Sequence, residues 1–168
     1  MAKKFFLVTD ASFSKKFAIY DEQKQMITGV KTNGFTDFFN IFLGWFINLP
    51  ESFKFKLDNN HVNIRSEASL LSAKYEIFIN DQSTVKIKKN RQNHQPQQRF
   101  SVLINNHELH FTEQNQGNYF SIMQDNQKII VAKRGLQQLD QYSVVISDQV
   151  DPATGIAIVI AIINSYKK

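Results

Sequence analysis

Residues 151–168, DPATGIAIVIAIINSYKK, constrain the fold more than any other stretch, because they contain the longest nearly unbroken apolar run in the chain. The run from Gly155 to Ile163 holds nine residues without a polar side chain. A membrane-spanning helix needs about twenty apolar residues. The segment is therefore too short to cross a bilayer and must find another way to bury its surface.

A strand and a helix both remain open for this segment. Isoleucines alternate with smaller residues, and β-branched residues favour strands, but periodicity cannot decide for a run that is apolar on every side. The start of the run favours a helix, because Asp151 is a good N-cap and Pro152 suits the first helical position. Lys167 and Lys168 place cations near the negative end of the helix dipole. We predict a helix from about Pro152 to Ser165, and a helix that is apolar all round must be buried all round.

Residues 52–132 consist of short alternating runs separated by polar turns. Asn and Asp tolerate the positive φ angles of tight hairpin turns, so paired Asn and Asp residues mark these turns. The predicted turn pairs are Asn59–Asn60, Asn80–Asp81, Asn105–Asn106 and Asp125–Asn126. The runs FFLVTD, KFAIYDE and QMITGVKTN precede this region, and QYSVVIS follows it. About a dozen antiparallel strands result, and closing them into a barrel is one way of hiding the sheet edges.

Two segments interrupt the strand pattern. Residues 88–99, KKNRQNHQPQQR, are almost wholly polar and predict a solvated loop. Residues 35–49 place aromatic side chains at helical spacing before Pro50, which predicts a short amphipathic helix. This helix either packs across the barrel mouth or forms an interaction surface with a membrane or another protein. The residues of that surface would be Phe38, Phe42, Trp45 and Phe46.

Length and composition predict one domain over residues 1–168, with 42% hydrophobic and 21% charged residues. The net charge of +5 favours anionic partners, but most cations are Lys rather than Arg, so sequence-specific nucleic-acid binding is not expected. Cysteine is absent, and the apolar start ends at Thr9 and Asp10, short of a signal peptide. We expect a cytoplasmic protein, and its bias toward Lys, Asn and Gln suggests a bacterial one. The oligomeric state is not predicted.

The sequence offers little evidence of catalysis. No nucleophile elbow, zinc-protease helix or phosphate-binding glycine loop occurs. The histidines are His61, His94, His107 and His110, and the last two are three apart in a predicted strand, so their side chains point to opposite faces. We therefore predict a protein that is not an enzyme and that uses no metal or cofactor.

Basic residues on strands are the candidate binding groups. Lys54 and Lys56 share one face of their strand, as do Lys86 and Lys88, by the period of two. Lys89 and Arg91 are expected in the loop that follows. If the two strands lay close together, these six residues would form a positive patch for phosphate groups. The competing interpretation is that they form the solvent side of half-buried strands whose Phe53, Phe55, Leu57, Val85 and Ile87 face inward.

The sequence resembles the tubby C-terminal-like superfamily, which includes the LURP-one-related proteins, the phospholipid scramblases and small bacterial members. The resemblance rests on the opening strands FFLVTD and KFAIYDE, the hairpin series and the terminal DPATGIAIVIAIINSYKK. It implies a mainly β fold in which a closed antiparallel barrel of about twelve strands surrounds a buried C-terminal helix. Some members bind phosphoinositide head groups through Lys and Arg on the barrel.

Two functional hypotheses follow. The first is a non-enzymatic tubby-like module that binds anionic phospholipid head groups at the cytoplasmic membrane surface, as a peripheral protein. The second is an intracellular scaffold or protein-interaction module that binds no lipid. A small apolar ligand inside the barrel conflicts with a terminal helix that fills the same space.

Overall fold

The computed structural model describes residues 1–12, 15–32, 51–67, 73–90, 99–115, 117–137 and 140–166. The strands are β1 (Lys3–Ser12), β2 (Lys15–Tyr20), β3 (Met26–Thr32), β4 (Ser52–Leu57), β5 (Asn60–Ser66), β6 (Lys74–Ile79), β7 (Gln82–Lys89), β8 (Phe100–Ile104), β9 (His107–Gln114), β10 (Tyr119–Gln124), β11 (Gln127–Arg134) and β12 (Gln141–Ile146). The helix α2 spans Pro152–Tyr166. The predicted aromatic helix at residues 35–49, with Phe38, Phe42, Trp45 and Phe46, lies outside the described residues, as does Arg91.

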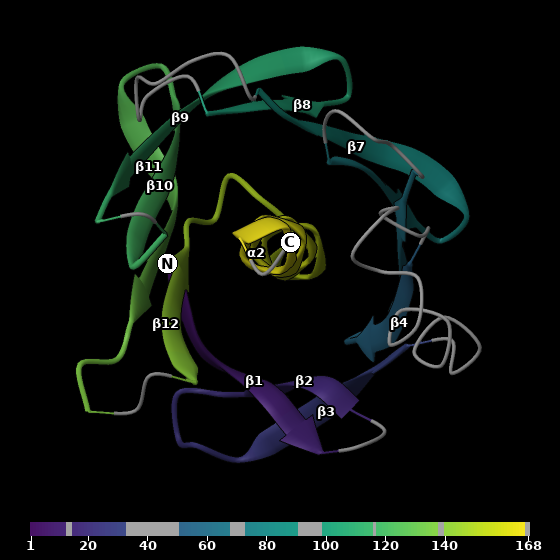
Figure 1. The fold of residues 1–168 in the computed structure, drawn as a ribbon, viewed down its shortest axis with the longest axis vertical. Helices are drawn as coiled ribbons and strands as arrows, with labels where there is room; N and C mark the ends of the chain where they lie inside the picture. Colours follow the sequence, from purple (N-terminus) through teal and green to yellow (C-terminus); the bar gives the residue numbers. More distant parts are fainter. Residues whose placement is uncertain are drawn as a thin grey trace.

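The strands form a closed antiparallel barrel in which each strand pairs with its neighbours in the chain. Closure comes from β1, which pairs with β12 over six positions from Lys3↔Ile146 to Val8↔Gln141. Figure 1 shows the ring of strands with α2 at its centre, seen nearly end-on. The predicted barrel around a terminal helix is confirmed.

Alternation along the strands separates an apolar interior from a polar exterior. On β4, Phe53, Phe55 and Leu57 are buried, whereas Lys54 and Lys56 are exposed. Strand β7 repeats the pattern, with its apolar residues buried between exposed lysines. The predicted inward faces of both strands are therefore confirmed, and basic side chains are displayed on the outer wall.

Three of the four predicted hairpin turns are confirmed. The pairs Asn80–Asp81, Asn105–Asn106 and Asp125–Asn126 all have positive φ angles, between 48° and 66°. The fourth prediction, Asn59–Asn60, was wrong by one residue.

This turn consists of Asp58 and Asn59, because Asn60 already pairs with Leu57 as the first residue of β5. Asp58 adopts the left-handed conformation, with a φ of 52°. The Asn60 side chain instead donates to Asp151 Oδ1 at 3.1 Å and accepts from Asn80 Nδ2 at 2.9 Å.

The start of α2 is held by the predicted N-cap. The Thr154 backbone N–H donates to Asp151 Oδ2 at 3.0 Å, and Pro152 occupies the first helical position. Every residue from Ala153 to Ser165 is buried. The helix is about 22 Å long at 1.5 Å per residue, so its apolar side chains fill the barrel along its axis. Within the described residues, no helix combines the length and the hydrophobicity that crossing a membrane requires.

Candidate functional site

Because α2 fills the barrel, its outer wall is the surface on which a ligand can bind. Described residues line three open cavities there, with volumes between about 380 and 540 Å³. One of them coincides with two of the predicted basic residues, Lys54 and Lys56. It lies beside the β3–β4 ladder of the barrel wall.

Among the described residues, β3 pairs with β4 at two positions, Lys31↔Lys54 and Thr32↔Phe53. By contrast, the β4–β5 hairpin is paired over six positions. A cavity of about 380 Å³ opens beside the short β3–β4 ladder, and Gly29 contributes backbone without a side chain to its lining. We call this cavity the seam groove. Its basic lining residues are Lys31, Lys54, Lys56 and His61.

The charges of the seam groove are suited to an anion. Lys31 and Lys54 lie directly opposite each other on neighbouring strands, an arrangement in which like charges repel. None of the ion pairs among the described residues involves Lys31, Lys54 or Lys56. Asp81 is the one acid among the described lining residues. An anion bound here would relieve the repulsion between the two opposed lysines.

The structure does not bring the predicted basic residues into one patch. Strands β5 and β6 separate β4 from β7, which corresponds to three strand spacings, or about 14 Å. Lys86 lies opposite Glu76, and Lys88 lies opposite Lys74. The lysines of β7 therefore belong to a different part of the wall from Lys54 and Lys56.

Lys89 was expected in the loop after β7, and this was wrong. It is the last residue of β7, and its Nζ donates to the Ser165 carbonyl oxygen at 2.7 Å. The ammonium group thus meets the last turn of α2, where free carbonyl groups and the negative end of the dipole attract a cation. Lys167 and Lys168, which were expected to serve this role, lie outside the described residues.

Sequence reasoning missed two of the four basic residues of the seam groove, Lys31 and His61. His61 pairs with Lys56, and the β4–β5 turn would have shown this if it had been placed correctly. Lys31 pairs with Lys54 across a long separation in the chain, and alternation within single strands carries no information about that pairing.

A comparison with protein-family models matches residues 3–163 to the family described as LURP-one-related. The chain belongs to the LURP-one-related family. This family is part of the tubby-like superfamily and is in general non-enzymatic. Neither the curated proteins nor the solved structures gave a match.

The three described histidines of this LURP-one-related chain lie on two different strands. His107 and His110 are both exposed on β9, and His61 lies on β5. Within the ranges that the structure describes, no group of three or more His, Cys, Asp or Glu side chains is placed to hold a metal ion.

A polar cluster inside the LURP-one-related barrel surrounds Asn164 near the end of α2. The Asn164 side-chain amide donates to Glu51 Oε2 at 2.8 Å and to the Tyr75 hydroxyl at 3.1 Å. Lys16 Nζ lies 3.4 Å from Glu51 Oε1, and the Glu51 backbone N–H donates to Ser66 Oγ at 2.7 Å. The Asn164 amide and the Lys16 ammonium group therefore offset the cost of burying the Glu51 carboxylate. This cluster stabilises the fold.

A second cluster encloses the end of α2. The Tyr166 hydroxyl donates to Glu113 Oε2, and Arg99 Nη1 lies 2.9 Å from Glu113 Oε1. Burial, strengthened by the Glu113 carboxylate, raises the pKa of Tyr166. Together with the Lys89 contact, this cluster fixes the end of the helix to the wall. Neither buried glutamate lines any of the three outer cavities.

The buried tyrosines predict loss of stability at alkaline pH. Burial, with a smaller contribution from Glu51, raises the pKa of Tyr75 far above its ordinary value of 10.0. Above about pH 10 the unfolded chain loses the Tyr75 proton while the folded chain keeps it, so the free energy of unfolding falls by about 1.4 kcal/mol per pH unit. Urea unfolding between neutral pH and about pH 11 measures this slope. Tyr75→Phe should reduce the fall in the free energy of unfolding by about 1.4 kcal/mol per pH unit. An unchanged slope would contradict the attribution of this pH dependence to Tyr75.

Proposed function

We propose that this chain is a non-enzymatic tubby-like module that binds anionic phospholipid head groups at the cytoplasmic membrane surface through its seam groove. The observation that carries the proposal is the opposed pair Lys31 and Lys54 beside an open cavity at the β3–β4 ladder. A phosphate group carries enough negative charge to interact with both ammonium groups at once.

Apolar residues beside the groove support a membrane surface rather than a dissolved anion. Met26 and Ile27, which directly precede the lining residue Thr28 on β3, are 49% and 40% exposed. Lysines around exposed apolar side chains are typical of surfaces that lie in the interface of an anionic bilayer. The lysines would attract the head groups while these side chains enter the interfacial region.

Vesicle co-sedimentation tests the proposal. We expect the protein to sediment with vesicles that contain phosphatidylserine or a phosphoinositide, and to remain in the supernatant with phosphatidylcholine alone. Binding should weaken steeply as salt approaches about 1 M, where the Debye length is about 3 Å. Equal recovery with neutral and anionic vesicles would contradict the proposal. Absence of binding to either would favour the alternative, a protein-interaction module that binds no lipid.

A soluble competitor distinguishes binding to the phosphate head group from binding to the bilayer as a whole. If both the phosphate contacts and the apolar residues contribute, inositol hexakisphosphate should displace the protein only at concentrations well above that of the accessible lipid. Displacement at equal concentrations would instead indicate a site for dissolved phosphates.

A further inference from the structure

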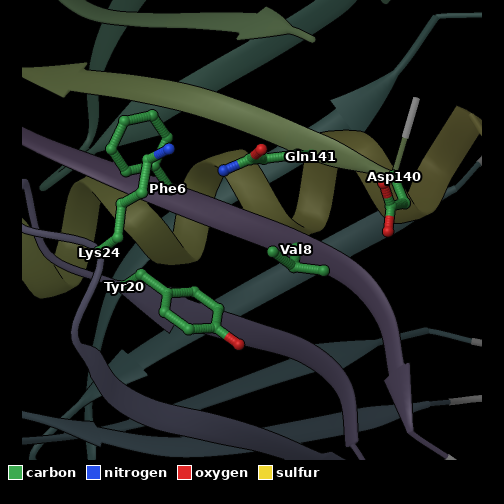
Figure 2. Close-up of a pocket in the computed structure, with 6 residues that line it drawn as sticks. All are labelled: Phe6, Val8, Tyr20, Lys24, Asp140 and Gln141. Carbon is green, nitrogen blue, oxygen red and sulfur yellow. The ribbon is translucent and has the colours of Figure 1, made fainter. Parts of the chain in front are cut away.

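The other two cavities form one groove on a different part of the outer wall. One has a volume of about 500 Å³ and the other about 540 Å³, and both are lined by Phe6, Lys24 and Gln141. Figure 2 shows the first of them on the outer side of the wall, with α2 behind the strands. We call the combined cavity the Phe6 groove. It shares no lining residue with the seam groove.

A row of paired residues forms the floor of the Phe6 groove. Tyr20 on β2 pairs with Phe6 on β1, and Phe6 pairs with Ser143 on β12. Ser143 in turn pairs with Lys133 on β11. The row therefore crosses four adjacent strands and changes from aromatic to basic along its length. Val8, on the same face of β1, extends the apolar end.

Lys24 is held in place over the aromatic end of this row. It has a φ of 60°, and its turn is closed by hydrogen bonds from Lys24 N to the Asp21 carbonyl oxygen at 3.1 Å and from Gln25 N to Asp21 Oδ1 at 2.7 Å. Its Nζ lies 5.9 Å from the centre of the Phe6 ring, and Figure 2 shows the side chain reaching across that ring. The turn therefore fixes the backbone from which the Lys24 side chain extends toward the groove.

The charge of the groove favours an acidic partner. Lys24, Lys133 and Arg134 line it, whereas Asp140 is the one acid among its described lining residues. Asp140 lies at the end of the cavity away from Lys24 (Figure 2). Gln141 and Gln137 add amide groups that can both donate to and accept from a peptide backbone.

We propose that the Phe6 groove binds a short acidic peptide segment of a protein partner. An apolar or aromatic side chain of the segment packs on Phe6, Val8 and Tyr20, and the carboxylates that follow it meet Lys24 and Lys133. The row spans three strand spacings, or about 14 Å, which accommodates about four or five extended residues. The amides of Gln141 and Gln137 contact the backbone of the segment between its two ends.

Fluorescence anisotropy with a defined probe tests this proposal. The probe is a labelled pentapeptide of one phenylalanine followed by four glutamates, and the matched peptide has glutamines in place of the glutamates. At about 0.1 M salt, where the Debye length is about 10 Å, we expect the glutamate peptide to bind at least about tenfold more tightly than the glutamine peptide. Equal affinity for both peptides, or tighter binding of a labelled oligothymidylate than of the glutamate peptide, would overturn the proposal.

Variants locate the binding. Phe6→Ser and Lys24→Asn should each weaken binding of the glutamate peptide at least about tenfold, since hot-spot residues have effects of this size. Asn tolerates the positive φ at position 24, so the turn should persist. Lys128→Asn is the matched control, because Lys128 lies near the opposite end of β11 and contacts the Tyr119 hydroxyl at 3.2 Å. Unchanged binding by the Phe6 variant, with folding verified by circular dichroism, would overturn the proposal. The peptide measurements and the vesicle measurements are independent, so neither result decides the other proposal.

Discussion

Truncation after Val150 is expected to abolish folding of the barrel. It removes α2, whose five isoleucines are all at most 2% exposed. Burial of one such side chain contributes about 2 kcal/mol. Their combined contribution is about 10 kcal/mol, which is of the same order as the entire stability of a typical domain, about 5–15 kcal/mol. The inward faces of all the strands that contact the helix would also lose their packing.

Near-ultraviolet circular dichroism and urea unfolding measure this effect, and a point variant separates the loss of packing from the loss of chain length. Ile158→Asp places a charge at the barrel centre and should also prevent folding. Ile158→Val removes one methylene group and should cost about 1 kcal/mol. A cooperative unfolding transition in the truncated protein would show that the strands fold without the helix, which would contradict this architecture.

Replacement of Asn164 by Asp is expected to produce the largest effect of any isosteric substitution in the interior polar clusters. The Asn164 amide, which is 1% exposed, donates to both Glu51 and Tyr75. Aspartate removes this donor and brings a second carboxylate against the buried Glu51. We expect a loss of at least about 3 kcal/mol at neutral pH, because an uncompensated buried charge costs about 3–5 kcal/mol.

The pH dependence of the stability of Asn164→Asp shows whether repulsion between two buried carboxylates causes the loss. Two neighbouring buried carboxylates raise the pKa of the pair in the folded state above the unfolded value of about 3.9. The deficit relative to the wild type is therefore largest at neutral pH and shrinks as the pH falls toward about 5. Urea unfolding at the two pH values measures it. The double variant Glu51→Gln with Asn164→Asp exchanges the two groups and should recover part of the stability; a deficit independent of pH would contradict the explanation.

The sequence predicted the architecture because the features that determine it are local. Asp151 and Pro152 identify the start of α2, and paired Asn and Asp residues identify most turns. Alternation of apolar and polar residues identified the outward lysines of β4 and β7. Each of these signals depends on residues close together in the chain, so it can be interpreted without knowing which strands are neighbours.

The candidate sites were harder to predict because they depend on pairing between distant strands. Alternation places Lys31, Lys54 and Lys86 on the outside equally, but only the strand order shows that the first two are opposed and the third is not. The inward contact of Lys89 depends on where α2 ends inside the barrel. The row from Tyr20 to Lys133 likewise requires closure of β1 on β12.

Two matched charge reversals on different parts of the outer wall test the proposed function most directly. Lys54→Glu with Lys56→Glu alters the seam groove, whereas Lys86→Glu with Lys88→Glu makes the same change in net charge on β7. Each lysine near an anionic membrane contributes about 1 kcal/mol, so the first pair should lower partitioning onto phosphatidylserine vesicles by roughly thirtyfold or more. The second pair should lower it only a fewfold. Equal losses from the two pairs, or unchanged partitioning by the first, would contradict binding at the seam groove.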